Sequence, residues 1–149
     1  MEIELLVRAV IEDHGRFLIA HTKGASNTYL PGGHVDAGES LKHALARELK
    51  EELGVAAKVG RYLGAIEHAW VDTAVNNHEI NHFFHVTWSG ANEDRPPKSL
   101  EDHIDFSWLA PSEFDKQNLQ PAPLRQLITN LKSQPQSIWY ASTIDPSEG

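Results

Sequence analysis

The chain has 149 residues, and 40% of them are apolar, which is enough to build the core of one domain. A formal net charge of −8 argues against a broad basic surface for duplex nucleic acid, and the lack of cysteine excludes disulfides and thiolate metal sites. No apolar run is long enough to cross a bilayer, and the start MEIELLVRAV lacks the basic region of a signal peptide. We therefore expect a cytoplasmic protein that binds neither duplex nucleic acid nor a membrane.

The first half of the chain predicts strands, a glycine loop and one helix. Strands are predicted over residues 3–12 and 16–22, with a tight turn at 13–15, and a short strand enters a glycine loop within 28–35. The helix is predicted from Ser40 to Leu53, because Ser40 can cap its start and leucines recur at every fourth position. Gly54 stands where a glycine commonly ends a helix.

The second half predicts three further strands and two short helices. The strands are expected over residues 56–69, 79–88 and 104–109, and the helices over 110–114 and 122–133. This order predicts an α/β fold in which helices pack against a mixed β-sheet.

The chain is expected to divide into one domain and a tail. Residues 1–133 are predicted to form the single domain, and residues 134–149 a C-terminal tail that is either docked or flexible. The apolar segment of this tail, Ile138 to Tyr140, suggests a homodimer contact.

The stretch HEINH, His78 to His82, fits the H-E-x-x-H pattern of zinc peptidases. That pattern binds zinc only on a helix, where the two histidines share one face; on a strand they lie roughly 13 Å apart. The surrounding run HEINHFFHVTWSG is rich in β-branched and aromatic residues, and apolar residues recur at every second position, which indicates a strand. A zinc peptidase is kept as a remote alternative that requires a helix here.

Three carboxylates crowd one side of the predicted helix. At about 100° per residue, Glu48, Glu51 and Glu52 fall in one sector beside the leucine face, with only Lys50 and Arg47 as nearby cations. A solvated acidic helix face would show the same charges. The preceding glycines, Gly32 and Gly33, favour a metal site instead, because they let the backbone pass close to the carboxylates. Oxygen ligands of this kind suit Mg²⁺ or Mn²⁺ better than Zn²⁺.

The stretch GGHVDAGESLKHALARELKEELGV resembles the Nudix box, G-x5-E-x7-R-E-U-x-E-E-x-G-U, where U is an aliphatic residue. Its fixed positions are all met, by Gly33, Glu39, Arg47, Glu48, Leu49, Glu51, Glu52, Gly54 and Val55. The strands before the box and the elements after it also follow the order of a Nudix domain. The resemblance implies the Nudix α/β/α sandwich with a mixed sheet.

The resemblance also implies a reaction and roles for the box residues. Nudix hydrolases cleave a pyrophosphate linkage in a nucleoside diphosphate joined to another group X, usually with Mg²⁺. By this likeness, residues Glu48, Glu51 and Glu52 hold the metal, Arg47 orients the carboxylates, and Glu39 keeps the loop in shape. The proton acceptor varies in the family.

Several residues are predicted to take the proton or bind substrate. For the proton, the candidates are Glu51 and Glu48 on the helix and Glu101 and Asp102 in the loop SLEDH. For the substrate, the candidates are His21 and Lys23 for phosphate, Glu79 and His82 on the HEINH strand, and Tyr29, Trp70 and Phe83 for stacking on a base. Each of these pocket residues has a purely structural alternative.

The substrate is expected to be a small nucleotide, with a nucleoside triphosphate or a nucleotide sugar as the leading predictions. Residues outside the box match no narrower group within the family. A non-catalytic nucleotide sensor with the same fold is the other alternative, against which the intact set of carboxylates argues.

Overall fold

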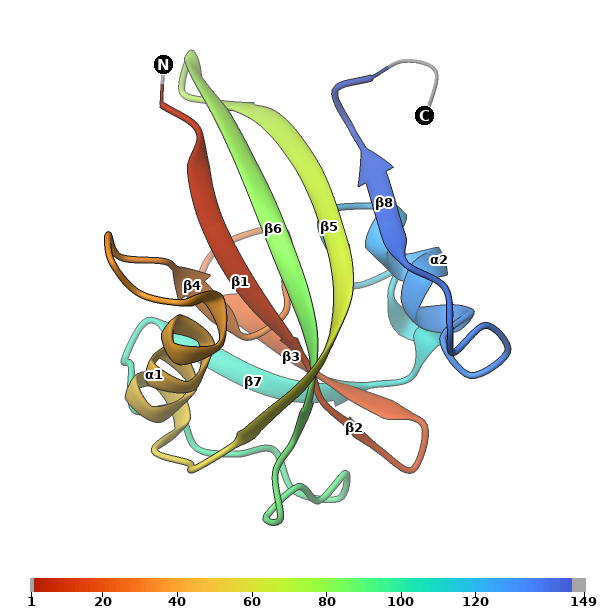
Figure 1. Cartoon of the computed structure of the whole chain (residues 1–149). Helices are drawn as coiled ribbons and strands as arrows, with labels where there is room; N and C mark the ends of the chain where they lie inside the picture. Colours follow the sequence, from red (N-terminus) through yellow and green to blue (C-terminus); the bar gives the residue numbers. More distant parts are fainter. Residues whose placement is uncertain (1, 146–149) are drawn as a thin grey trace.

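The computed structural model describes residues 2–145, which build two β-sheets and two helices (Figure 1). One sheet has five strands in the order β4-β1-β6-β5-β8, and the other has three in the order β2-β3-β7. The strands are β1 Glu4–Val10, β2 Glu12–Asp13, β3 Arg16–Thr22, β4 Gly32–His34, β5 Lys58–Asp72, β6 Val75–Thr87, β7 Ile104–Leu109 and β8 Trp139–Ser142. The helices are α1 Leu41–Leu53 and α2 Pro123–Thr129, with a 3₁₀ turn at Pro111–Glu113.

The five-stranded sheet is mixed, as the sequence predicted. Strand β1 runs parallel to β6 and β5 runs parallel to β8, whereas β1 with β4 and β5 with β6 are antiparallel. Helix α1 lies on one side of the strands and α2 on the other (Figure 1). Two buried clusters follow from this arrangement, one including Leu45 and Leu49 of α1 and one including Leu124 and Ile128 of α2. The predicted α/β fold is confirmed.

Helix α1 begins and ends as predicted. The Ser40 side chain accepts a hydrogen bond from the backbone N–H of His43 at 3.1 Å, and Gly54 leaves the helix with a left-handed φ of 69°. The leucines at positions 45, 49 and 53 are buried against the sheet. Glu48, at the edge of this buried face, therefore lies against Gly33 of β4.

Among residues 2–145, no helix has the length and apolarity that a membrane crossing requires.

The HEINH segment lies within β6, so the helix that a zinc peptidase site requires is not formed. The observed hairpin is longer than predicted, because β5 extends to Asp72 and β6 starts at Val75. Thr73 and Ala74 make the turn with φ of 45° and 63°. Since neither is a glycine or asparagine, the sequence carried no signal for a two-residue turn at this place.

Part of the C-terminal tail forms strand β8 against β5. Trp139 is buried and its ring packs 5.6 Å from that of Phe83, whereas Ile138 and Tyr140 are exposed. Gly64 of β5 allows this contact, because a Cβ at that position would collide with the Trp139 backbone oxygen. Residues 146–149 of the tail lie outside the described residues. Dimerisation through Ile138 to Tyr140 stays a prediction.

We expect Trp139→Ala to lower the free energy of unfolding by about 3–5 kcal/mol, because the substitution empties a buried site in the core on the α2 side. Urea denaturation would measure the loss. Ile138→Ala is the matched control, since Ile138 is 84% exposed and its truncation should change stability by less than about 0.5 kcal/mol. A loss below about 1 kcal/mol for Trp139→Ala would mean that β8 adds little to the fold.

Candidate active site

Two glycines bring the edge strand β4 close to β1 and α1. Gly32 has a left-handed φ of 142°, and a Cβ there would collide with the backbone oxygen of Val7. At Gly33 a Cβ would lie 2.6 Å from the carboxyl carbon of Glu48. Because Gly33 has no side chain, the Glu48 carboxylate can lie directly against the backbone of β4.

Arg47 joins the loop before α1 to the helix carboxylates. Its guanidinium donates two hydrogen bonds to Glu39, from Nε at 2.7 Å and from Nη2 at 2.8 Å. Nη1 also donates to Glu48 at 3.1 Å and to both oxygens of Glu51 at 3.3 Å, and Nη2 donates to the backbone oxygen of His34 at 3.1 Å. A planar, five-donor group is required for this many simultaneous bonds.

The Arg47 contacts shift the ionisation of both partners. The hydrogen bonds from Arg47, with one from the Asp36 backbone N–H, lower the pKa of Glu39 to about 2. The same bond to Glu39 raises the pKa of Arg47 despite its partial burial. The pair therefore stays charged at neutral pH and holds the loop against the helix.

Glu52 is a buried carboxylate with an unsatisfied oxygen. Only 5% of the residue is exposed, and its Oε2 has no hydrogen-bond partner among the described residues. Burial raises its pKa to about 8, although the nearby positive charge of Arg8 opposes the shift. A hydrogen bond from the Gly32 backbone also opposes the shift, so only Oε2 is left without a partner. A buried, unsatisfied carboxylate oxygen is costly to retain, which indicates that a group from outside the protein chain compensates it.

Glu48, Glu101 and Arg8 surround Glu52. Burial raises the pKa of Glu48, and the negative charges of Glu48 and Glu101 both raise that of Glu52. Glu101 reaches this place because the backbone N–H of Leu100 donates to the Glu52 carbonyl oxygen at 2.7 Å. Glu48 and Glu101 thus lie near enough to Glu52 for their negative charges to act on it, with Arg8 as a nearby cation.

This donor set fits a hard divalent cation. Carboxylate oxygens and backbone carbonyls are the ligands that Mg²⁺ and Mn²⁺ prefer, and the unpartnered Oε2 of Glu52 is a free ligand atom. Glu48, Glu52 and the backbone at Gly32 could hold such an ion. Of the predicted proton acceptors, Glu51 is turned toward Arg47 and Asp102 is exposed, whereas Glu48 and Glu101 lie near Glu52.

We expect Arg47→Lys to lower kcat by about 10- to 100-fold, because lysine cannot make the forked bonds that orient the carboxylates. Steady-state kinetics would measure the change. Arg16→Lys is the matched control, since Arg16 is exposed and its ion pair among residues 2–145 is with Glu113, at 3.4 Å. Unchanged kcat in Arg47→Lys would show that the positive charge alone is enough.

A cavity of about 710 Å³ lies on the α2 side of the sheet. Strands β1, β5 and β6 form one wall, and the segments around residues 25–30 and 118–124 form another. Arg8 lines the cavity and also lies near Glu48 and Glu52, so it connects the cavity to the carboxylates. The volume is in the range of small-molecule sites.

Only some of the predicted pocket residues line this cavity. Tyr29, Trp70, Glu79 and Phe83 do. The lining does not include His21, Lys23 or His82. His21 bonds the Ala25 backbone oxygen at 2.8 Å and Lys23 pairs with Asp105 at 3.9 Å.

His82 instead bonds the Tyr62 hydroxyl at 2.7 Å. Strand alternation puts His82 on the face of β6 opposite to Glu79.

The polar cavity residues that the sequence analysis missed include Arg8, Asn81 and His68. Arg8 is the one charge inside the apolar run LLVRAVI, which is a usable signal for a functional residue. Asn81 is 1% exposed, and a buried asparagine in a strand is a similar signal. Burial lowers the pKa of His68, although Glu79 opposes the shift.

Comparison with known proteins shows the family of this chain. The NUDIX domain family model matches residues 5–131. A CTP pyrophosphohydrolase of Escherichia coli (strain K12) is 30% identical over 139 residues, which cover 89% of this chain and 96% of that protein. A nucleoside triphosphatase, NudI, of Escherichia coli is 23% identical and covers 85% of this chain and 96% of its own length.

Two solved structures share the fold. The MutT protein of Methanosarcina mazei Go1 is 26% identical with a TM-score of 0.70, covering 92% of this chain and 99% of its own. The E. coli ORF135 protein is 28% identical with a TM-score of 0.64, covering 92% and 96%. Since the family model spans most of the chain, the chain belongs to the NUDIX domain family.

Proposed function

We propose that this chain hydrolyses nucleoside triphosphates to a nucleoside monophosphate and pyrophosphate with the help of a divalent cation. The observation that carries the proposal is the buried, unpartnered Glu52 carboxylate, which is linked through Arg8 to a cavity of about 710 Å³. The predicted reaction class, hydrolysis of a pyrophosphate linkage in a nucleotide, is confirmed by the family and by the relatives. The triphosphate substrate is the narrower part of the proposal and rests on the names of those relatives.

The cation is proposed to bind at Glu48 and Glu52 with the backbone of Gly32. When bound, a divalent ion neutralises phosphate oxygens and makes water a stronger nucleophile at neutral pH. The protein contributes the position of the ligands, because Arg47 fixes Glu48 and the α1 leucines fix Glu52. Mg²⁺ is the proposed ion, with Mn²⁺ as the substitute.

Arg8 and Glu101 are proposed to act on the substrate and on water. Arg8 donates to the backbone oxygen of Leu30 at 3.2 Å and to Asn81 at 3.3 Å, so its guanidinium is held where the cavity meets the carboxylates. It would bind the phosphates there. In hydrolysis, a P–O bond forms from water, the anhydride P–O bond breaks, and pyrophosphate leaves with the electron pair. Glu101 would take the proton from water.

The experiment is a panel of nucleotides incubated with Mg²⁺ in ¹⁸O-labelled water and followed by ³¹P NMR. The panel contains the common nucleoside triphosphates, ADP-ribose, nucleotide sugars and dinucleoside polyphosphates. The proposal predicts that triphosphates are cleaved fastest, with the label in the monophosphate. Faster cleavage of a nucleotide sugar would replace the proposed substrate. Binding without any cleavage would favour the nucleotide sensor.

A further inference from the structure

The cavity contains a buried carboxylate, Glu79, whose orientation is fixed by a chain of hydrogen bonds. Glu79 lies on β6, lines the cavity and is 8% exposed. Arg8 Nε donates to the Asn81 side-chain oxygen at 3.3 Å, and Asn81 Nδ2 donates to Glu79 Oε1 at 2.9 Å. Because an arginine can only donate, it holds the oxygen of the Asn81 amide toward itself and the amide nitrogen toward Glu79.

The second carboxylate oxygen, Oε2, is available to a ligand. Within residues 2–145, the one side-chain hydrogen bond to Glu79 goes to Oε1, so no protein group donates to its Oε2. Oε2 of Glu79 is not among the fully buried, unsatisfied atoms of these residues, so it is open to the cavity. An ionised carboxylate only accepts hydrogen bonds. A ligand group next to Glu79 must therefore be a donor, and an acceptor in the same place would be repelled.

Two side-chain rings, stacked on each other, line the cavity beside this acceptor and offer an outer ring face for stacking. The rings of His68 and Trp70 are stacked at 5.2 Å with an interplanar angle of 20°, and both residues line the cavity. His68 is directly opposite Glu79 in the register of β5 with β6. A nucleobase stacked on this surface would turn its hydrogen-bonding edge toward Glu79.

We propose that Glu79 selects nucleobases that carry an exocyclic amino group, cytosine above the otherwise similar uracil. The amino group at C4 of cytosine donates to a carboxylate, whereas uracil has a carbonyl oxygen at that position, which only accepts. This inference rests on the proposed function, because it assigns the base of the proposed triphosphate substrate. A hydrogen bond to a charged group supports a preference of roughly 10- to 100-fold.

The Asn81 amide makes a reversal of this preference testable. In Glu79→Gln, Asn81 Nδ2 still needs an acceptor, so the glutamine turns its oxygen to Asn81 and its NH₂ group to the cavity. The cavity then presents a donor in place of an acceptor. The variant is therefore expected to prefer uracil over cytosine by about 10-fold.

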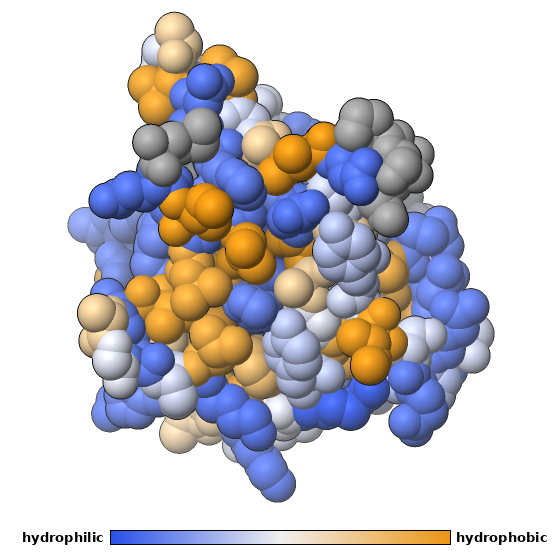
Figure 2. Space-filling model, turned by 45° about the horizontal axis from the view of Figure 1, so that its top comes forward, coloured by the Kyte–Doolittle hydropathy of each residue, from blue (hydrophilic) through white to orange (hydrophobic). Residues whose placement is uncertain are grey.

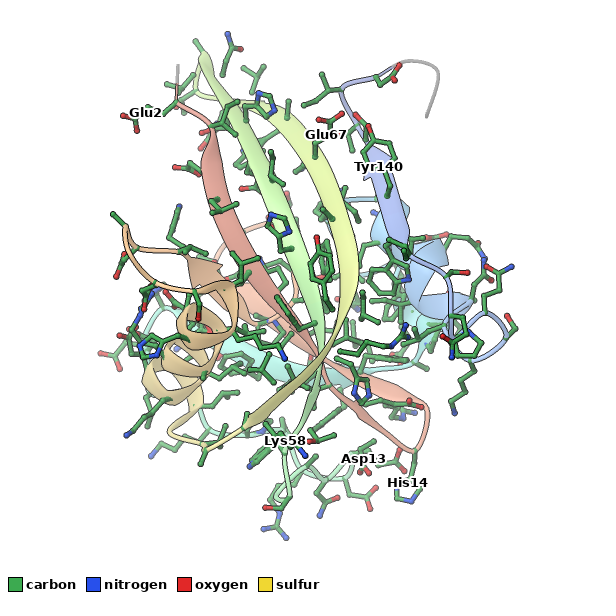
Figure 3. All side chains as sticks on the ribbon, viewed as in Figure 1. Glu2, Asp13, His14, Lys58, Glu67 and Tyr140 are labelled. Atoms are coloured by element: carbon green, nitrogen blue, oxygen red, sulfur yellow. The ribbon has the colours of Figure 1, made fainter. Side chains whose placement is uncertain are left out.

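The test is isothermal titration calorimetry with the α,β-methylene analogues of CTP and UTP in the presence of Mg²⁺. Wild type should bind the CTP analogue roughly 10- to 100-fold more tightly, and Glu79→Gln should bind the UTP analogue more tightly. Glu67→Gln is the matched control, because Glu67 lies on the other face of β5 and accepts from Tyr140 (Figure 3). It should keep the wild-type preference.

The result separates this inference from the proposed function. Equal affinity of wild type for the two analogues, or binding of neither, would overturn the role of Glu79. This comparison uses the wild-type protein alone, so it does not depend on whether a variant folds. An unchanged preference in folded Glu79→Gln would overturn it as well. If the analogues bind as expected but CTP is not cleaved in a parallel ³¹P NMR assay, the selection by Glu79 stands and the proposed hydrolysis fails.

Discussion

Replacing Glu52 with glutamine is expected to lower kcat/KM for the nucleotide substrate by about a thousandfold or more, which corresponds to about 4 kcal/mol of transition-state stabilisation. Glutamine keeps the volume and removes the charge, so the loss would come from the site and not from the core. Among residues 2–145, Oε2 of Glu52 is the buried carboxylate oxygen that no hydrogen bond satisfies, which leaves it available to a cation. Steady-state kinetics with Mg²⁺ at saturating and subsaturating substrate would measure the change.

Glu67→Gln serves as the control for this substitution, because it removes one charge from a partly exposed position on β5 outside the cavity and should leave kcat/KM unchanged. Circular dichroism of both variants would check the fold. If Glu52→Gln keeps more than about a tenth of wild-type activity, Glu52 is not the residue on which the chemistry depends.

The second large effect concerns stability against pH without metal. Burial in the folded protein holds the pKa of Glu52 at about 8, against an ordinary glutamate value of 4.5. Between these values the unfolded chain has released the proton while the folded protein keeps it, so stability falls as pH rises. The slope is at most about 1.4 kcal/mol per pH unit, and a few kcal/mol are lost across the window. Glu39 does not interfere, because its pKa of about 2 places its effect at lower pH.

Urea denaturation in EDTA at pH 5, 6, 7 and 8 would measure this loss. Glu52→Gln should lack this part of the pH dependence and should exceed wild type by a few kcal/mol at pH 8, with little difference at pH 5. Mg²⁺ should raise the Tm of wild type at pH 8 and leave that of Glu52→Gln nearly unchanged. Parallel pH curves for the two proteins would show that Glu52 does not keep its proton in the fold.

The local part of the site was predictable from sequence because it lies in one continuous stretch. The cap at Ser40, the turn at Gly54 and the position of Glu48 and Glu52 on one side of α1 follow from helical periodicity. Periodicity cannot rank the carboxylates, however. Periodicity places Glu51 in the same sector of α1, yet in the structure Glu51 pairs with Arg47, which stands four residues before it.

The pocket could be predicted only in part, because it depends on pairing between distant strands. Asn81 contacts Arg8 across 73 residues of sequence, through the parallel register of β1 with β6. Strand alternation did place Glu79 and His82 on opposite faces, but it could not tell which face holds the cavity. Strand β8 was unpredictable for a similar reason, since its four residues form a strand only by pairing with β5.

The apolar surface of the molecule bears on dimerisation. Figure 2 shows apolar residues gathered on one face with hydrophilic residues around them. Large apolar side chains are exposed on several strands of the five-stranded sheet, including Leu5, Tyr62, Val71 and Tyr140. Removal of the tail would also remove β8, so it is a poor test of the predicted homodimer. Ile138→Asp keeps Trp139 in place, and sedimentation of this variant would show whether the exposed apolar residue holds a dimer together.

Binding of Mn²⁺, measured by electron paramagnetic resonance, tests most directly that the α1 carboxylates form the cation site. The control is Glu93→Gln, because Asp13, His14 and Glu93 are a group in residues 2–145 whose ligand atoms lie within 4.8 Å of one another and could hold an ion. Asp13 and His14 lie at the β2–β3 turn, away from α1 (Figure 3). Glu52→Gln is predicted to weaken Mn²⁺ binding at least about 10-fold, while Glu93→Gln keeps the wild-type affinity. Wild-type affinity in Glu52→Gln, or its loss in Glu93→Gln, would contradict the account.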